Sequence, residues 1–142
     1  SINMKKVNLQ YAGGFPFETD TLAWMQDAYR DAISAICLMF GQKVIVSGCV
    51  IANSVISNGI IFYQGEVIPF EGGAYSSTMG YVFEEENLIE TYQDGSSHPA
   101  YTIKKCKLTT DTTNNFNSEF KRFDLELLLN RVEILWTYRT TT

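Results

Sequence analysis

The alternation of apolar and polar residues divides the chain into one long helix followed by short strands. Apolar or small side chains recur at alternating steps of three and four residues at Leu22, Met25, Tyr29, Ala32, Ile36 and Met39. This spacing is typical of an amphipathic helix with a heptad-like seam. We predict that the helix is capped by Thr19, Asp20 or Thr21 and ends at Gly41.

The seam has two interpretations, which the sequence leaves open. It packs on the sheet of its own subunit, or it lies on the symmetry axis of an assembly. Trp24 and Tyr29 lie about 140° apart on the helix, because successive residues are rotated by about 100°. One of them is therefore expected to point away from the core. Trp24 either anchors a partner or rests under an extended N-terminal arm at residues 7–11.

After Gly41 the pattern changes to β-branched runs separated by turn residues. Gln64 and Gly65 lie between two apolar runs, which predicts a tight hairpin. We interpret Glu84 to Glu86 as a solvated turn between two short strands. The regular spacing predicts an antiparallel meander. The strands are expected at residues 44–51, 55–56, 60–63, 66–70, 81–84, 87–92 and 100–108.

The C-terminal part has a polar linker at residues 109–115 and then a second helical pattern. Apolar residues at helical spacing follow at Phe116, Phe120, Phe123, Leu127 and Leu128, which predicts a helix to about Asn130 capped by Asn117 or Ser118. The residues from 132 onward fit a helix or a strand. The predicted fold is therefore α+β: a helix plus β-meander assembly domain at residues 1–108, and a linker with a C-terminal helix and tail at residues 109–142.

Composition excludes several classes of function. The chain has 142 residues and a net charge of −5, which disfavours binding to nucleic acid or to an anionic membrane surface. No segment reaches the ~18 apolar residues of a membrane span, and the N-terminal residues lack the pattern of a signal peptide. Cys37, Cys49 and Cys106 are far apart in sequence, which favours buried free thiols in a reducing cytoplasm.

The residues offer little reaction chemistry. His98 is the single histidine and lies in a predicted loop, without a sequence signature for a nucleophile or an orienting carboxylate. Gly13 and Gly14 precede a helix but do not match a phosphate-binding loop. We therefore predict no catalytic residue, no cofactor and no metal site.

Four segments of the chain form an ordered set of motifs. The helix-opening segment is Gly-Gly-Phe-Pro at 13–16, Asp-Thr-Leu at 20–22 and Met-Gln-Asp-Ala-Tyr at 25–29. Val-Ser-Gly-Cys at 46–49 follows, then a glycine-rich hairpin from Gly59 through Gly65-Glu66-Val67 and Phe70 to Gly72-Gly73. The last segment comprises Tyr92, Asp94, Gly95, Ser96 and Tyr101. In this order the segments resemble small structural proteins encoded with the tail and fibre genes of Bacteroidetes phages and in related contractile injection particles.

The resemblance spans about residues 13 to 101. Gln64-Gly65 replaces the more usual Asn-Gly turn, and the residues after Leu108 match no segment of the family. The resemblance implies a virion component that passes through the bacterial host cytoplasm during assembly. It also implies a homo-oligomer, often a trimer, that binds other phage structural proteins and carries no catalytic residues.

Three hypotheses follow from the sequence. The leading one is a non-enzymatic assembly subunit of a phage tail, fibre or head-decoration region. The second is a ligand-binding or enzymatic α+β domain with a pocket lined by Tyr63, Phe70, Tyr81 and Tyr101. The third is an accessory protein that binds a host factor through its C-terminal helix. The expected interface residues are Leu22, Trp24, Met25, Tyr29, Phe120, Phe123, Leu127 and Leu128.

Overall fold

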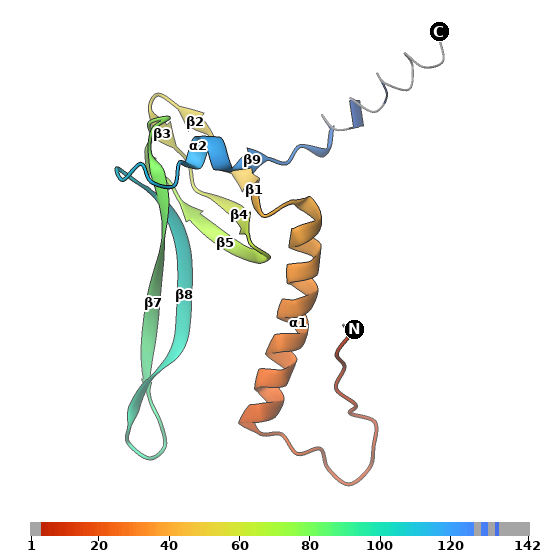
Figure 1. The fold of residues 1–142 in the computed structure, drawn as a ribbon. Helices are drawn as coiled ribbons and strands as arrows, with labels where there is room; N and C mark the ends of the chain where they lie inside the picture. The colour runs from red at the N-terminus through yellow and green to blue at the C-terminus, as the bar shows by residue number, and fades with distance from the viewer. Residues whose placement is uncertain (1–3, 127–128, 131–132, 134–142) are drawn as a thin grey trace.

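Two long arms project from one end of a mixed β-sheet (Figure 1). In this computed structural model, residues 4–126, 129–130 and 133 are described. One arm is α1 (Thr19–Phe40), and the other is the hairpin of β7 (Gly80–Thr91) and β8 (Ser97–Thr109). The remaining elements are β1 (Lys43–Gly48), β2 (Ile51–Ala52), β3 (Val55–Ile56), β4 (Gly59–Tyr63), β5 (Glu66–Glu71), β6 (Gly73–Ala74), α2 (Phe116–Glu119) and β9 (Lys121–Arg122).

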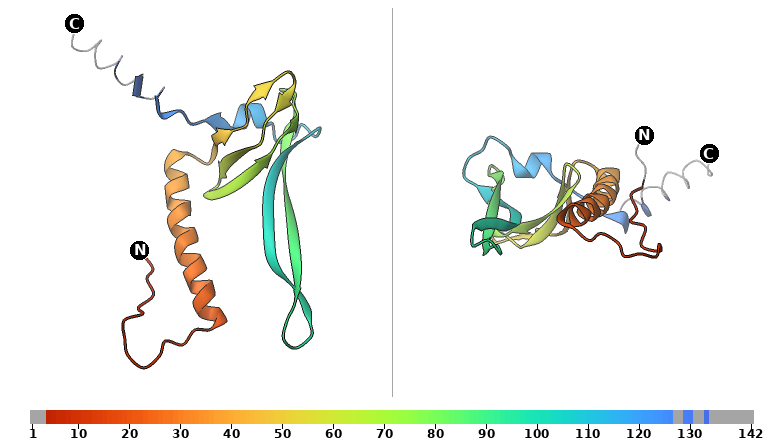
Figure 2. Two further views of the ribbon diagram at one scale, coloured as in Figure 1. Left: turned by 180° about the vertical axis from the view of Figure 1, so that it is seen from behind. Right: turned by 90° about the horizontal axis from the view of Figure 1, so that it is seen from below.

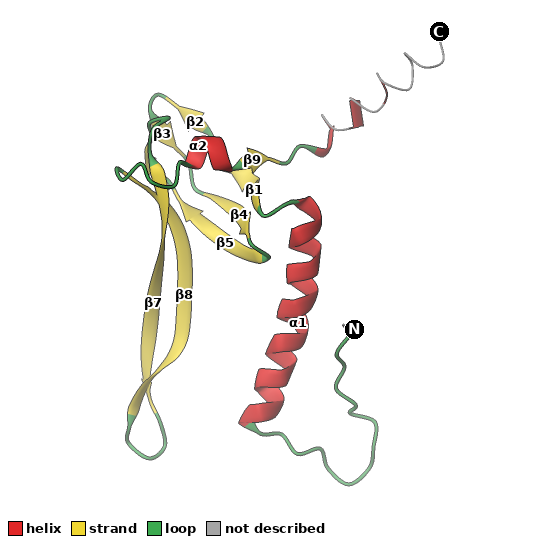
Figure 3. Cartoon of the chain, in the orientation of Figure 1, coloured by secondary structure: helices red, strands yellow, loops and turns green. Residues whose placement is uncertain are grey.

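The coarse prediction of an α+β fold with a long N-terminal helix is confirmed, but the antiparallel meander is only partly correct. The main sheet has the order β7-β8-β5-β4-β1-β9. β8 pairs with β5 in parallel, and β9 pairs with β1 in parallel. A small second sheet has the order β2-β3-β6. The parallel pairing arises because β7 lies at the edge of the sheet and its hairpin partner β8 returns alongside β5 (Figure 3).

The local turn signals were read correctly at the β4–β5 hairpin. Gln64 and Gly65 both have positive φ angles, 47° and 86°, as a two-residue hairpin with a type I′ turn requires. Gly41 also ends α1 as predicted, with a φ of 122°. The N-cap prediction is wrong, because Glu18, the residue before Thr19, occupies that position and its carbonyl accepts the first helical amides.

The prediction of a turn at Glu84 to Glu86 is wrong, since these residues continue β7 without a break. Each lies opposite a residue of β8, with Glu84 facing Lys105 and Glu85 facing Lys104. The Glu84 carboxylate binds Lys107, and this contact together with the nearby Lys105 lowers the pKa of Glu84. Cross-strand charge pairs of this kind stabilise a sheet, so the acidic run is compatible with a strand.

The predicted C-terminal helical appendage is also corrected. α2 has four residues, with Asn115 accepting the Ser118 amide as its N-cap. Phe120 leaves the helical conformation, and β9 then adds to the edge of β1. The Phe123 amide donates to the Ile45 carbonyl at 3.0 Å. Pairing with the open edge of β1 is therefore favoured over continuation of the helix. The boundary at residue 108 stays a prediction, although residues on both sides of it share one core.

The core lies where the main sheet meets the small sheet and α2, away from the ends of both arms (Figures 1 and 2). Tyr81 packs edge-on against both Phe116 and Phe120, whose rings stack with centroids 4.9 Å apart. Burial raises the pKa of Tyr81 to about 12, helped by its hydrogen bond to Glu119. The buried cluster consists of Ile45, Cys49, Ile56, Ile61, Ile68, Phe70, Tyr81, Cys106, Phe116 and Phe120.

Candidate interaction surface

Both arms lack buried residues along most of their length. Within the described chain, no residue of 4–36 and none of 82–105 is buried. α1 spans about 33 Å at 1.5 Å per residue, and a 12-residue strand spans about 40 Å. The arms are therefore held at one end only, and their outer parts have no core of their own.

α1 is fastened to the sheet by its C-terminal half. Cys37 is its single buried residue, and burial raises the pKa of this thiol. Gly65, in the β4–β5 turn, lies directly against the Ser34 hydroxyl and near Leu38. The ring of Phe40 contacts Phe62 and Phe123, with centroids 5.9 Å and 4.6 Å away. These contacts set the direction in which the rest of the helix projects.

The predicted seam of α1 lies away from this attachment. At 100° per residue, its members cluster on the side of the helix opposite Ser34 and Cys37. Their side chains are between 41% and 79% exposed, apart from Ala32, whose small side chain is also exposed. We call this surface the α1 stripe; it consists of Leu22, Met25, Tyr29, Ala32, Ile36 and Met39.

The residues beside the α1 stripe carry no charge. In a heptad with the stripe at positions a and d, the e positions are Gln26, Ile33 and Phe40, and the g positions are Thr21, Ala28 and Ala35. Charged residues usually occupy e and g in two-stranded coiled coils, whereas an additional apolar flank is typical of helices in larger bundles. Asp27, Arg30 and Asp31 lie on the remaining helix surface.

The N-terminal arm covers the side of α1 that carries Trp24. Lys5 forms an ion pair of 2.9 Å with Asp31, and this contact raises the pKa of Lys5. Trp24 is 41% exposed and borders a hollow of about 380 Å³ that is also lined by Val7 and Phe15. Trp24 therefore rests beside the arm, which was one of the two interpretations of the sequence.

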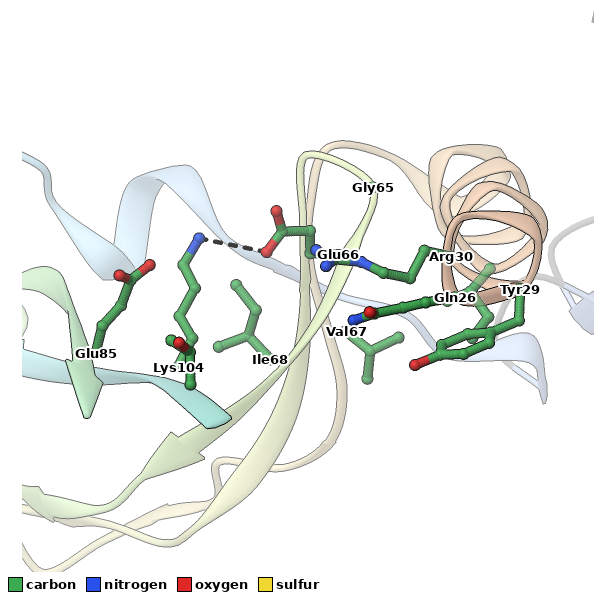
Figure 4. A pocket seen from close by; sticks show the side chains of 11 residues that line it. Gln26, Tyr29, Arg30, Gly65, Glu66, Val67, Ile68, Glu85 and Lys104 are labelled. Carbon is green, nitrogen blue, oxygen red and sulfur yellow. Dashed lines mark hydrogen bonds and ion pairs between the residues drawn. The ribbon is translucent and has the colours of Figure 1, made fainter. Parts of the chain in front are cut away.

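A groove runs between α1 and β8. Its outer part has a volume of about 1060 Å³ and is lined by Leu22, Met25, Tyr29 and Ala32 of the α1 stripe, by the N-terminal arm, and by residues 100–102 of β8. Its inner part, of about 520 Å³, lies beside the β4–β5 turn. Figure 4 shows this part, with Gln26, Tyr29 and Arg30 extending from α1, and Lys104 paired with Glu66 at 3.3 Å.

The residues predicted for the interface lie in different parts of the structure. Leu22, Met25 and Tyr29 belong to the exposed α1 stripe, and Trp24 borders the N-terminal arm. Phe120 is 4% exposed and stacks in the subunit's own core, while Phe123 packs on Phe40. That these residues contact a partner stays a prediction. Leu127 and Leu128 lie outside the described residues.

The four aromatics of the ligand-pocket hypothesis do not line one cavity. Phe70 and Tyr81 are buried in the core, and Tyr63 packs against that core with its ring centroid 4.5 Å from Phe83. Tyr101 is 62% exposed on the outer part of β8. The predicted convergence of these side chains is therefore wrong.

The titratable side chains form structural contacts. At the hairpin tip, the Ser96 hydroxyl donates to Asp94 and lies 2.8 Å from His98 Nε2. This order places serine between the other two groups, whereas a catalytic triad places histidine there. Within the described residues, no cluster of three or more His, Cys, Asp or Glu side chains is arranged to hold a metal ion. The three cysteines are free and buried, as predicted.

Sequence reasoning missed an apolar patch on the hairpin. Leu88, Tyr101 and Ile103 are exposed on β7 and β8. The sequence could have revealed this patch, because charged residues are replaced by apolar ones at alternate positions of a single strand.

No described helix has the length and apolar character needed to cross a bilayer.

Comparison with known proteins gives a similarity to a solved structure. No family model and no curated protein matches the chain. Among solved structures, the chain is similar to the C24 protein from the Antarctic microorganism Bizionia argentinensis, with 26% sequence identity and a TM-score of 0.56. The match covers 78% of this chain and 40% of that protein, so this chain spans less than half the length of its structural relative.

Proposed function

We propose that the protein is a non-enzymatic assembly subunit of a phage virion, in a tail, fibre or head-decoration region, and that it assembles as a homotrimer through α1. The α1 stripe carries this proposal. Six residues at heptad spacing are exposed along α1, and no described residue of the subunit buries them. A second copy presents the same stripe, and closed symmetry allows each copy to cover the next.

The flanks of the α1 stripe favour three helices over two. Ile33 and Phe40 widen the apolar face on one side, and Ala28 and Ala35 permit close approach on the other. No like charges face each other across such a seam, because its flanking positions are uncharged. Association is therefore expected to depend little on salt. The partners in the particle would be other phage structural proteins, and the host cytoplasm would be the place of assembly.

The virion role is supported by the ordered resemblance of residues 13 to 101 to phage structural proteins. The similarity to a protein of Bizionia, a member of the Bacteroidetes, agrees with the bacterial group of those phages. A groove whose walls come from two unsupported arms also fits a subunit completed by its neighbours better than a catalytic site, which needs a rigid surrounding shell.

The assembly can be tested with two matched substitutions. Ala32→Lys places a charge in the α1 stripe, and Ala23→Lys places the same charge on an exposed helix position outside it. We expect light scattering at micromolar concentration to give a trimer mass for the wild type and for Ala23→Lys. Ala32→Lys should be monomeric, with at least a 100-fold weaker association. A wild-type protein that stays monomeric at high concentration contradicts the proposal.

The particle role needs a separate measurement. Mass spectrometry of purified particles from the phage or cell that encodes the chain should detect it at a stoichiometry that is a multiple of three. If the protein assembles in solution but is absent from particles, the proposed oligomer stands and the proposed virion role is wrong.

A further inference from the structure

The outer edge of β7 carries backbone groups without a partner strand. β7 is the last strand on its side of the main sheet, and among the described residues it pairs only with β8, apart from a bridge at its first residue. The Tyr81 amide points away from β8 and donates to the Asn114 carbonyl at 3.0 Å. Because the direction of the backbone groups alternates along a strand, Glu85 and Asn87 also direct their amides and carbonyls away from β8. This edge is therefore open to a further strand.

The open edge of β7 is acidic. Glu85 and Glu86 are exposed, and neither forms an ion pair within the described chain. Lys104, the residue of β8 opposite Glu85, pairs with Glu66 instead. Two β7 edges brought together would repel each other, because like charges on neighbouring strands destabilise a sheet. The edge fits an extended segment that carries positive charge.

The N-terminal arm has the features of such a segment. Lys5 and Lys6 precede Val7, Asn8 and Leu9, so two basic residues lead into an alternation of apolar and polar positions that is typical of a strand. No backbone group of residues 4–15 forms a hydrogen bond with another described residue, and Leu9 is 64% exposed. The arm therefore has the sequence of a strand but no strand partner in the described part of its own subunit.

The arm is held to its own subunit by exposed contacts. The 2.9 Å ion pair between Lys5 and Asp31 leaves the two side chains 34% and 59% exposed, and exposed ion pairs contribute little to stability. Gly13 and Gly14 join the arm to the segment before α1, with φ angles of 107° and 83° and nothing within 4 Å of an added Cβ. Glycine is permissive at such angles, so the arm can change direction there without a steric clash.

Parallel pairing of the arm with β7 matches both charge and polarity. If Leu9 lies beside Leu88, a parallel strand also brings Lys6 beside Glu85, with Lys5 next to the same acidic run. Because side chains alternate between the two faces of a strand, Leu9 then projects on the same face as Leu88, which is 40% exposed. In the antiparallel direction, the same apolar match moves the two lysines past the acidic run, to residues 91 and 92.

We propose that the open edge of β7 accepts residues 5–9 of the N-terminal arm of a second copy as a parallel strand. A second copy supplies the arm because α1 lies between the arm and the hairpin of one chain in each view (Figures 1 and 2). Strand addition derives its affinity from main-chain hydrogen bonds and its specificity from alternate side chains. In a closed assembly each copy donates one arm and accepts another. The exchange uses a surface separate from the α1 stripe and does not require it.

Cross-linking between two variants tests both the contact and its register, because the three native cysteines are buried. Parallel pairing places the Cα atoms of residues 9 and 88 about 5 Å apart, within the ~4.4–6.8 Å range of a disulfide. The Cα atom of residue 7 would lie about 8 Å from that of residue 88, beyond this range. We expect a mild oxidant to join Leu9→Cys to Leu88→Cys, in a mixture of the two variants, faster than Val7→Cys to Leu88→Cys by roughly 10-fold or more.

Charge reversal tests which segment occupies the edge. In the variant with the arm cysteine, Lys5→Glu together with Lys6→Glu should slow cross-linking to the rate of the Val7→Cys control. Adding Glu85→Lys and Glu86→Lys to the variant with the β7 cysteine should restore the faster rate, because the charges are then exchanged between the strands. With the native charges, cross-linking should slow as salt rises from about 0.1 M to about 1 M, where the Debye length falls from about 10 Å to about 3 Å.

Four outcomes would overturn the arm exchange without deciding the trimer, which light scattering tests separately. A mixture that forms no cross-link shows that the edge does not accept an arm. If the double variant Leu9→Cys/Leu88→Cys forms its disulfide within a monomer while the mixture does not react, the occupant is the chain's own arm and the proposal is wrong. A faster reaction of Val7→Cys contradicts the parallel register. Charge-reversed variants that cross-link at an unchanged rate contradict the charge complementarity on which the choice of the arm rests.

Discussion

The ring of Phe40, in the last turn of α1, packs edge-on against the ring of Phe123, with centroids 4.6 Å apart and planes at 69°. Phe123 is itself fixed to β1 by a backbone hydrogen bond to Ile45. The pair therefore joins the base of the helical arm to the segment that follows β9. Since α1 is attached at one end only, this contact helps to determine where the whole arm points.

Replacing Phe123 by alanine should destabilise the subunit and loosen the base of α1. An aromatic pair contributes about 0.5–1.5 kcal/mol beyond the area that it buries, so we expect a total loss of about 1–2 kcal/mol. Urea unfolding measures the loss, and hydrogen exchange should show faster opening of the last turn of α1. Phe17→Ala is the control, because Phe17 is exposed and its loss should change stability by less than about 0.5 kcal/mol. Equal losses for the two variants would contradict this role of the pair.

Gly65 and Gly95 provide a matched test of how α1 is attached. Their φ angles are +86° and +87°, but a methyl group at Gly65 would overlap the Ser34 hydroxyl, whereas one at Gly95 would meet nothing within 4 Å. Alanine at either site costs roughly 1–2 kcal/mol from the backbone conformation. We expect Gly65→Ala to cost at least about 1 kcal/mol more than Gly95→Ala in thermal or urea unfolding.

A double-mutant cycle isolates the contribution of the close approach. Ser34→Ala removes the hydroxyl that the added methyl group would overlap, so it should recover much of the extra loss in Gly65→Ala. If the losses in the free energy of unfolding from the two substitutions are additive, the β4–β5 turn does not contact α1 as closely as the positions of Gly65 and Ser34 indicate.

The features predictable from the sequence are those fixed by neighbouring residues. The seam from Leu22 to Met39 specified a helix through its spacing, and Gln64-Gly65 specified a two-residue turn through its tolerance of positive φ angles. These signals do not depend on which element the segment meets later. The same seam could not reveal whether its own sheet would cover it, because that depends on where the attachment at Ser34 and Cys37 places the helix.

The features that could not be predicted depend on pairing between distant segments. β8 lies beside β5 in parallel because the intervening hairpin reverses the chain, and no local pattern around Cys106 encodes that neighbour. The Glu84 to Glu86 run resembles a turn until its partner lysines on β8 are known. Phe116, Phe120 and Phe123 have helical spacing, yet the chain leaves the helix after one helical turn and pairs, as β9, with the open edge of β1.

Replacing Trp24 by alanine should weaken assembly more than folding. Trp24 lies beside the N-terminal arm next to the α1 stripe, and its side chain is partly exposed, so it contributes little to the subunit core. We expect the association constant from light scattering to fall by about tenfold or more, with a change of less than about 1 kcal/mol in the free energy of unfolding of the dissociated subunit. Tyr11→Ala, which removes another exposed aromatic of the arm, serves as the comparison. Unfolding of Trp24→Ala without any change in association would contradict this role.

Alkaline pH should destabilise the fold through three buried groups. Burial raises the pKa of Cys49 from 9.0 to about 11, that of Cys106 from 9.0 to about 12, and that of Tyr81 from 10.0 to about 12. Each group keeps its proton in the folded state at a pH where the unfolded chain has lost it. Their contribution to stability is therefore complete below about pH 9 and is lost progressively as the pH rises toward 12.

Urea unfolding at intervals between pH 8 and pH 12 measures this loss, and Cys106→Ala identifies one of its sources. The variant should be less stable at pH 8, because it leaves a small cavity in the core. Its stability should nevertheless fall less steeply above pH 9 than that of the wild type, since the variant has one fewer buried group that loses a proton on unfolding. Parallel stability curves for the variant and the wild type would show that Cys106 does not titrate as its burial requires. The exposed α1 stripe contains no cysteine, so dissociation of the assembly by itself should not reproduce the difference in slope.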